Sequence, residues 1–359
     1  MHEHLLLTPK DILPSYPGWT VKSVINPAVI RLPDRHILMY ARVAEAAPQA
    51  KGKMMSCPVI ASGDHYQMRA EAVHRRQIRR ITGNVIFLKN DTCRLTTFSS
   101  FRKILLDKDG FTVSHIQDKP AFTGLPGDGE YGVEDPRFTK IGKQYAMTYV
   151  AVNKNEGVST ALALTRDFVK WKRSGIIFRE QNKDVVLFPE RIKGRYVALH
   201  RPEGFFEFSK PSIWISYSPD LAYWGREKSI VQPREGWESV RIGSGAPPIR
   251  TKDGWLLIYH GVEKKGEGRK EHKVYSAGAL LLDKRNPEHI LARSPANKPL
   301  FRPMRPYERK GFINEVVFPT AAVPSLDRDS LLIYYGGADT VTAVKEIALS
   351  AILKHMRWE

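Results

Sequence analysis

The chain alternates short apolar runs with polar turns, and one such pattern recurs five times. In each copy a proline stands near the start of an apolar run, a polar turn with Gly or Asp follows, and a second apolar run ends in Tyr, His or Arg. The copies cover residues 26–43, 134–152, 188–202, 247–262 and 318–339. Each copy predicts a β-hairpin, because two short apolar runs around a turn are typical of paired strands.

The spacing of the copies predicts how the hairpins are organised. Their prolines stand at positions 27, 136, 189, 248 and 319, so the intervals are 109, 53, 59 and 71 residues. An interval of about 50 to 70 residues with a hairpin in each unit is typical of propeller blades. The longer first interval indicates extra material in that unit. Residues 161–178 and 212–231 each predict two further strands, which would be the outer strands of their blades.

We therefore predict an all-β fold, a five-bladed β-propeller that forms a single catalytic domain over residues 1–359, with the active site at the central channel. The alternative from the pattern alone is a β-sandwich with repetitive hairpins.

Composition narrows the class of protein. The 359 residues are 42% hydrophobic and 26% charged, which is typical of a globular protein. No apolar run approaches 18 residues, so we expect no membrane association. The two cysteines, Cys57 and Cys93, do not make a disulfide scaffold, and free thiols indicate a cytoplasmic protein.

The formal charge of +18 does not by itself predict a nucleic-acid partner. Lys and Arg are scattered singly and in pairs, and the chain has no zinc-finger spacing, basic helix or RNA-binding aromatic motif. We interpret most of these charges as solvated surface, with a few serving an anion site, and expect no nucleic-acid partner.

Polar residues at the ends of the predicted inner strands would converge on the channel. They combine carboxylates, such as Asp135 and Asp339, with cations, such as Arg201 and Arg241. A pair of carboxylates would suit a glycosidase, whereas converging cations make a pocket for a small tetrahedral anion such as phosphate. A sugar held between an acid and a phosphate predicts phosphorolysis with inversion at the anomeric carbon.

Other chemistries lack their motifs. The chain has no GxSxG, P-loop, HExxH or strand-linked GxGxxG sequence. We expect no metal and no cofactor, with inorganic phosphate acting as a co-substrate.

Several motifs also carry a family resemblance. They read YGVEDPRF, NKDVVLFPERIKGRYVALHRP, RIGSGAPPIRTKDGWLLIYHGV, YSAGALLLDKRNPEHILAR and FINEVVFPTAAV followed by LLIYYGGAD. In this order, from about residue 20 to 350, the chain resembles the β-mannoside phosphorylases of glycoside hydrolase family 130. The resemblance implies a five-bladed β-propeller that uses phosphate to cleave β-mannosides and releases mannose 1-phosphate.

The resemblance also implies roles for individual residues. The catalytic acid would be Asp135, whose proton passes through the mannose 3-hydroxyl. The phosphate-binding residues would be Lys183, Arg201, Arg241, His260 and Tyr275. The sugar-binding residues would be Asn26, Arg42 and Asp339. We add Glu134 and Glu190 to the substrate-binding residues, with structural alternatives for both: an ion pair with Arg137 for Glu134 and a contact between blades for Glu190.

One departure keeps a second function open. Several relatives have Arg-Asn before LFPE, where this chain has Lys183-Asp184. Asp184 opposes phosphate and could activate water, which would make the protein a phosphate-independent β-mannosidase. Because a cation stands at all three family positions, we favour the phosphorylase, acting on β-1,2-linked mannobiose or mannooligosaccharides. A third alternative is a non-catalytic propeller that binds carbohydrate or nucleic acid.

Other features bear on specificity and assembly. Loops 45–80 and 262–274 would select the linkage and the acceptor, and Tyr131 and Trp237 could stack on sugar rings. The expected partners are a mannoside oligosaccharide and inorganic phosphate, and the resemblance leaves a homo-oligomer open.

Overall fold

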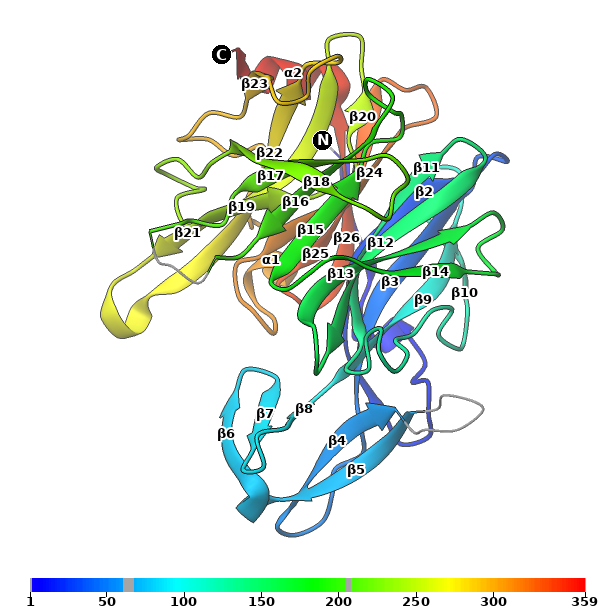
Figure 1. Cartoon of the computed structure of the whole chain (residues 1–359), viewed down its shortest axis with the longest axis vertical. Helices are drawn as coiled ribbons and strands as arrows, with labels where there is room; N and C mark the ends of the chain where they lie inside the picture. Colours follow the sequence, from blue (N-terminus) through cyan, green and yellow to red (C-terminus); the bar gives the residue numbers. More distant parts are fainter. Residues whose placement is uncertain (1, 61–67, 205–207, 359) are drawn as a thin grey trace.

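A computed structural model describes residues 2–60, 68–204 and 208–358, and its regular structure is almost entirely β-strand (Figure 1). Residues 61–67, part of the predicted specificity segment 45–80, lie outside the described residues. The prediction of an all-β fold is confirmed.

Five antiparallel sheets, each built from a nearly continuous part of the chain, make up most of the fold. The first sheet has the order β2 (Thr20–Arg31), β3 (Ile37–Ala46), β9 (Phe98–Leu106), β10 (Val113–Ile116). The second has the order β11 (Val133–Ile141), β12 (Gln144–Asn153), β13 (Gly157–Thr165), β14 (Lys172–Phe178). The third has the order β15 (Asn182–Leu187), β16 (Tyr196–Pro202), β17 (Ile213–Ser218), β18 (Gly225–Val231).

The last two sheets each recruit one end of the chain. The fourth has the order β19 (Arg241–Ser244), β21 (Trp255–Lys265), β22 (His272–Leu282), β23 (Ile290–Arg293), β27 (Arg357–Trp358), and β20 (Ile249–Arg250) also pairs with β21. The fifth has the order β24 (Val317–Pro324), β25 (Ser330–Gly337), β26 (Val341–Ala348), β1 (His2–Leu7). These two sheets, which the repeat pattern predicted from internal segments of the chain, therefore also contain one strand from each end of the chain.

Two of the five predicted hairpins begin too late. The first strand of the third sheet, β15, ends at Leu187 before Pro189, and β19 ends at Ser244 before Pro248. Pro189 therefore follows a strand instead of opening one, whereas Pro248 follows β19 and directly precedes the two-residue strand β20, which pairs with β21. The other three hairpins match the prediction, as do the outer strands β13, β14, β17 and β18.

The extra material predicted in the first repeat is an insertion between β3 and β9. It contains two small sheets, one of β4 (Met54–Ile60) and β5 (Met68–His74), the other of β6 (Ile78–Thr82), β7 (Val85–Leu88) and β8 (Cys93–Leu95). Figure 1 shows it projecting at the bottom of the molecule, away from most of the other strands. Cys57, Val73, Ile86 and Leu88 give it a small core of its own.

The main apolar core is divided into five clusters, each shared by two sheets that follow one another in the chain or by the fifth and the first. One cluster, for example, joins Val29 of the first sheet to Val344 of the fifth. Every sheet therefore buries side chains on both faces, which explains why the inner strands read as near-continuous apolar runs.

Helices are short and lie outside the sheets. They are η1 (Pro9–Asp11), η2 (Arg75–Gln77), η3 (Gly268–Lys270), α1 (Pro306–Arg309) and α2 (Leu349–His355). In the part of the chain that the structure describes, no helix has the length and apolar character needed to cross a membrane.

Threonine hydroxyls form hydrogen bonds to backbone carbonyl oxygens of neighbouring sheets. Thr148 of β12 donates to the carbonyl oxygen of Val185 in the third sheet at 2.6 Å, and Thr320 of β24 donates to that of Pro27 in the first sheet at 2.7 Å. Both threonines are buried. Each bond gives a backbone carbonyl oxygen of one sheet a donor from the next sheet.

We predict that Thr148→Val lowers the free energy of unfolding by about 1–3 kcal/mol, because it leaves the buried carbonyl of Val185 without its donor. Urea unfolding would measure the change, with Thr20→Val, at an exposed position of β2, as the matched control. Equal stability of the two variants would contradict this role of Thr148.

Candidate active site

Three polar side chains leave the first strands of the first three sheets at equivalent irregularities. Asn26, Asp135 and Asp184 have φ angles of 47°, 48° and 56°, and each lies where the register against the neighbouring strand shifts. Asn and Asp tolerate this left-handed backbone better than most residues. Because a bulge redirects a side chain that regular alternation would place elsewhere, the three breaks send these side chains toward one pocket.

That pocket has a cavity volume of about 250 Å³ and contains ten of the eleven residues that we predicted for the site. They are Asn26, Arg42, Glu134, Asp135, Lys183, Arg201, Arg241, His260, Tyr275 and Asp339. The first strands of the first four sheets and the β25–β26 turn all contribute. Residues more than 300 positions apart are thereby brought together.

Glu190 does not line this pocket, so the structure does not bring it together with the other predicted substrate ligands. It forms an ion pair with Arg250 at 2.5 Å, and the two side chains are 48% and 56% exposed. Lys183 stands at the start of β15, whereas Glu190 lies beyond its end, about 20 Å further along an extended chain. The contact instead links the third and fourth sheets, as the structural alternative for Glu190 proposed.

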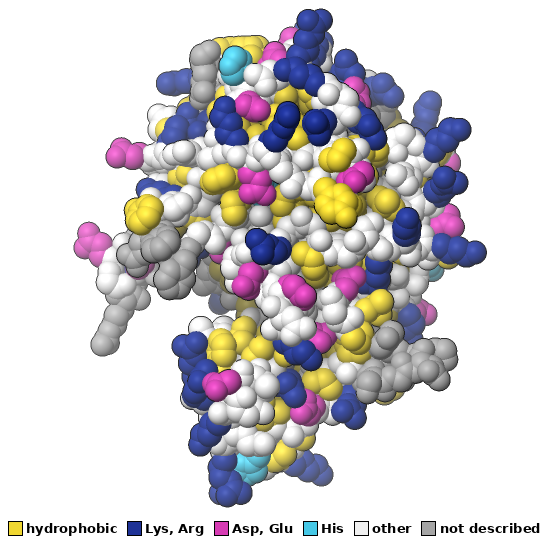
Figure 2. All heavy atoms as spheres, in the orientation of Figure 1, with side chains coloured by type: hydrophobic (Ala, Val, Ile, Leu, Met, Phe, Trp, Pro, Cys, Tyr) yellow, Lys and Arg dark blue, Asp and Glu magenta, His cyan; other side chains and the backbone are white. Residues whose placement is uncertain are grey.

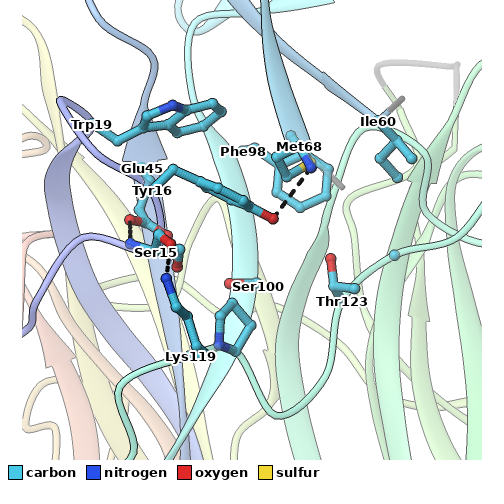
Figure 3. Close-up of a pocket in the computed structure, with 12 residues that line it drawn as sticks. Ser15, Tyr16, Trp19, Glu45, Ile60, Met68, Phe98, Ser100, Lys119 and Thr123 are labelled. Carbon is cyan, nitrogen blue, oxygen red and sulfur yellow. Dashed lines mark hydrogen bonds between the residues drawn. The ribbon is translucent and has the colours of Figure 1, made fainter. Parts of the chain in front are cut away.

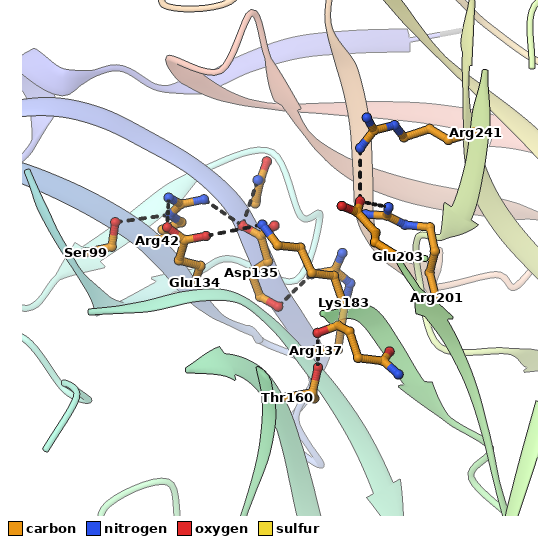
Figure 4. A network of polar contacts seen from close by, with 12 residues as sticks. Arg42, Ser99, Glu134, Asp135, Arg137, Thr160, Lys183, Arg201, Glu203 and Arg241 are labelled. Carbon is orange, nitrogen blue, oxygen red and sulfur yellow. Dashed lines mark hydrogen bonds and ion pairs between the residues drawn. The ribbon is translucent and has the colours of Figure 1, made fainter. Parts of the chain in front are cut away.

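One end of the pocket holds the predicted acid (Figure 4). Asp135 accepts hydrogen bonds from Asn26 Nδ2 at 2.8 Å and from Arg42 Nη1 at 3.0 Å, both on Oδ1. Arg42 also binds Glu134 at 2.6 Å and donates to Ser99 Oγ at 3.1 Å. Oδ2 of Asp135 is therefore the oxygen left to face a ligand.

The two carboxyl groups at this end have pKa values that move in opposite directions. Burial alone would raise the pKa of Asp135, but the charges of Arg42, Arg137 and Lys183 outweigh it and lower the pKa. Burial raises the pKa of Asp339, and Arg42 does not reverse that effect. In the unliganded protein Asp135 is therefore ionised at neutral pH, and any process that protonates it must overcome its cationic neighbours.

Arginines gather at the other end of the pocket. Arg201 binds Asp184 through Nε at 2.6 Å and also contacts Glu203 through Nη1. Arg241 Nη1 lies 3.0 Å from the same oxygen of Glu203. In Figure 4 Lys183 lies between this group and the acid, and its Nζ is 3.9 Å from Glu134 Oε2.

His260 completes this end as a neutral group. Burial lowers its pKa to about 4, although Asp184, 3.6 Å away, opposes the shift. Among the residues that the structure describes, neither ring nitrogen of His260 has a hydrogen-bond partner, and the same holds for Arg241 Nε. Buried polar atoms without partners are rare, so the N–H groups of His260 and Arg241, together with the acceptor nitrogen of His260, indicate a site for a ligand that forms hydrogen bonds.

A glycine makes the close packing of this end possible. A Cβ atom at Gly243 would lie 2.1 Å from Asp184 Oδ2 and 2.6 Å from His260 Cε1. Any side chain at this position would therefore displace the charged groups. Gly243 is thus needed for packing at the anion end, and the segment that contains it is a strand, β19, not the start of a helix.

Five further residues of the pocket were not predicted. They are Gln181, Glu203, Ile313, Val316 and Phe318. Phe318 packs against the ring of His260 with centroids 4.4 Å apart, which gives the pocket an apolar wall. Glu203 stands two residues after Arg201, and a carboxylate so close to a predicted anion-binding arginine was the signal that could have found it.

Asp184, which we considered as a base for water, is held as the partner of Arg201. Burial alone would raise its pKa, but Arg201 and His260 outweigh it and hold the pKa at about 2. Its side chain is 1% exposed. A carboxylate with so low a pKa is a weak base, so this position does not favour the hydrolytic alternative.

The two aromatic residues predicted to stack on sugar lie elsewhere. Trp237 is buried against Tyr259 and donates to the carbonyl oxygen of Pro295 at 2.9 Å, so the prediction for Trp237 was wrong. Tyr131 borders a different cavity, of about 950 Å³, between the insertion and the second sheet.

Another cavity, of about 390 Å³, lies beside the first sheet (Figure 3). Tyr16, Trp19 and Phe98 line it, but its charged groups Glu45 and Lys119 are both bound to Ser15. It holds none of the predicted site residues. The pocket with the acid and the arginines therefore remains the candidate active site.

The surface displayed in Figure 2 has mixed charge, and the described residues contain no cluster of metal ligands. Figure 2 shows Lys and Arg side chains distributed over the displayed face with Asp and Glu between them. Within residues 2–60, 68–204 and 208–358, no group of three or more His, Cys, Asp or Glu side chains is placed to hold a metal ion.

Comparisons with known proteins agree on one family. The model of glycoside hydrolase family 130, described as beta-1,4-mannooligosaccharide phosphorylase, matches residues 106–358. A beta-1,2-mannobiose phosphorylase of Listeria innocua is 33% identical over 99% of this chain and 98% of its own length. A 1,2-beta-oligomannan phosphorylase of a Thermoanaerobacter species is 38% identical over 69% of this chain and 78% of its own.

A solved structure extends this similarity to three dimensions. It is that of the beta-1,2-mannobiose phosphorylase from Listeria innocua in complex with beta-1,2-mannobiose. The two folds align with a TM-score of 0.84 and 32% identity over 99% of both chains.

We predict that Asp184→Asn lowers the free energy of unfolding by about 3 kcal/mol at pH 7, because it breaks a buried ion pair and leaves Arg201 undercompensated. The folded-state pKa of Asp184 is below the unfolded value of about 3.9. Its stabilisation is therefore complete above pH 4 and is lost as the pH falls through about 2.

Thermal unfolding of both proteins between pH 7 and pH 2.5 would measure this effect, with Asp329→Asn, at an exposed position, as the control. The difference between wild type and Asp184→Asn should shrink below pH 4. A difference that stays constant across this range would contradict the assigned pKa.

Proposed function

Because this chain belongs to glycoside hydrolase family 130, we propose that it cleaves β-1,2-linked mannobiose or mannooligosaccharides with inorganic phosphate. The products are mannose 1-phosphate and a shortened sugar. One observation carries the proposal: a single pocket holds a carboxylic acid at one end and arginine and histidine donors, some of them unpartnered, at the other. The relatives named β-1,2-mannobiose and 1,2-β-oligomannan phosphorylase support the substrate class.

The chemistry follows from the two ends of the pocket. The β-mannoside lies between them, with Asn26, Arg42 and Asp339 on its sugar hydroxyls. Phosphate at the Arg201–Arg241 end attacks the anomeric carbon from the face opposite the leaving oxygen, which inverts the configuration. The bond from that carbon to the leaving oxygen breaks as the bond to phosphate forms.

Asp135 supplies the proton that the leaving oxygen needs, through the mannose 3-hydroxyl. Since its pKa is lowered in the free protein, it must gain a proton when the ligands bind. A phosphate anion that compensates Lys183 and a sugar that excludes water both raise the pKa of Asp135 in the complex. No cofactor is required, because phosphate is the second substrate.

We further propose that the five sheets are the blades of a five-bladed β-propeller in a single domain, with the pocket at its central channel. Strands of each sheet contact the innermost strand of the next, and β24, β25 and β26 of the fifth sheet contact β2 of the first. The five core clusters between successive sheets support the same arrangement.

Hydrolysis is not favoured on the same scaffold. Lys183, Arg201 and Arg241 all face the pocket, and a hydrolase has no need of three cations beside its water. The engaged Asp184 is a poor base for water.

We expect β-1,2-mannobiose to be converted to mannose 1-phosphate and mannose only when inorganic phosphate is present. The measurement is product analysis with and without phosphate, with β-1,4-mannosylglucose tested in parallel as a linkage control. Mannose formed at the same rate without phosphate would contradict the proposal and support the hydrolase.

Asp135→Asn should lower kcat by about 10²–10⁴-fold, because it removes the proton donor but keeps the size of the side chain. The variant should remain folded and bind inorganic phosphate, with a lower melting temperature because Arg42 loses a paired carboxylate. Asp329→Asn is the matched control, and an Asp135→Asn variant with most of its activity would exclude Asp135 as the acid.

A further inference from the structure

Glu203 occupies the point where the two pocket arginines converge. One oxygen, Oε1, contacts both Arg201 Nη1 and Arg241 Nη1, the latter at 3.0 Å. The residue follows the last position of β16 and is part of the pocket lining. A carboxylate oxygen between two guanidinium groups has the position and the charge that a phosphate oxygen would take.

Carboxylates accompany the cations of the pocket without any added anion. The lining residues with charged side chains are the cations Arg42, Lys183, Arg201 and Arg241 and the carboxylates Glu134, Asp135, Asp184, Glu203 and Asp339. Arg137 adds a positive charge near Asp135. A phosphate anion that entered this set would add negative charge beside these carboxylates. It therefore binds more easily if Asp135 gains a proton, and more easily still if a carboxylate at the arginine end gives up its cations.

Glu203 and Asp184 differ in their ability to do so. Asp184 is 1% exposed, and it binds Arg201 through Nε, away from the two terminal nitrogens. Glu203 is 28% exposed, and its contacts are to the terminal Nη1 atoms of both arginines. Asp184 thus holds Arg201 through its Nε atom. Glu203 contacts the Nη1 atoms of both arginines, which a tetrahedral anion would use.

We propose that the carboxylate of Glu203 is an internal competitor that fills the phosphate seat between Arg201 and Arg241 and exchanges with phosphate in each catalytic cycle. The proposal rests on the function given above, in which phosphate is the co-substrate. It assigns Glu203 a positioning and specificity role for the anion and no part in bond cleavage.

Exchange of this kind has two consequences. The apparent affinity for phosphate is reduced by the fraction of molecules in which Glu203 covers the seat. The same carboxylate returns to the arginines as mannose 1-phosphate leaves, so it keeps two buried cations compensated between turnovers. Glu203 thus lowers the affinity of the enzyme for phosphate and makes the release of mannose 1-phosphate easier.

Glu203→Gln tests the proposal, because it keeps the shape of the side chain and removes its charge. Calorimetric titration with inorganic phosphate, in the absence of any mannoside, should show a Kd about 10-fold lower than in the wild type. The KM for phosphate, and the KM for mannose 1-phosphate in the synthetic direction, should fall with it, while kcat changes less. Glu227→Gln, an equal change of charge at an exposed position of β18, is the control.

A second variant separates competition from support. Glu203→Asp keeps the charge but shortens the reach by one methylene, so its Kd for phosphate should lie between those of the wild type and Glu203→Gln. If Glu203 instead held the arginines in place, Glu203→Gln would bind phosphate more weakly and Glu203→Asp would partly rescue it. That result, or an unchanged Kd in Glu203→Gln, would overturn the proposal.

The titration also distinguishes this inference from the proposed function. A wild-type protein that binds no phosphate and releases mannose without it would remove the function itself. A wild-type protein that binds and consumes phosphate, with no tighter binding in Glu203→Gln, would leave the function intact and reject the competitor.

Discussion

Buried guanidinium groups set the constraint on which the rest of the site depends. Arg137 and Arg201 are almost completely buried, and a charge removed from water is costly unless partners compensate it. Arg137 binds the carbonyl oxygens of Gly245 at 2.6 Å and Asp135 at 2.9 Å, and Arg201 binds Asp184. The guanidinium of Arg137 therefore joins the second sheet to the segment after β19 of the fourth sheet, whereas that of Arg201 joins β15 and β16 within the third sheet. The site and the packing of the sheets thus stabilise one another.

The backbone is shaped to deliver the compensating groups. Asn26, Asp135 and Asp184 adopt left-handed φ angles at register shifts in the first strands of the first three sheets. Such conformations cost energy for most residues and persist where the surroundings over-determine them. Here the surroundings are the inter-sheet hydrogen bonds, such as that from Thr148 beside Asp184, and the space left by Gly243.

The balance of charged groups in the pocket also decides how the pocket can bind a ligand. A neutral His260, whose ring nitrogens lack partners among the described residues, offers hydrogen bonding without further charge. Arg201 and Arg241 each contact a carboxylate in the unliganded protein. At the acid end, the cations around Asp135 lower its pKa. Ligand binding and proton transfer are therefore linked through a shared set of cations.

The sequence by itself determined the repeat of five hairpins, the all-β class and ten of the residues that meet in the pocket, because apolar periodicity and short motifs are local properties. Only the tertiary structure decided that the start of β15 faces the pocket. Asp184, near that end, therefore lines the pocket, whereas Glu190, beyond the other end, does not. The tertiary structure also showed that Glu203 joins two arginines and that Trp237 belongs to the core. These outcomes depend on where strands begin and on which charges meet across sheets, and such contacts join residues that are distant in the chain, so local patterns cannot specify them.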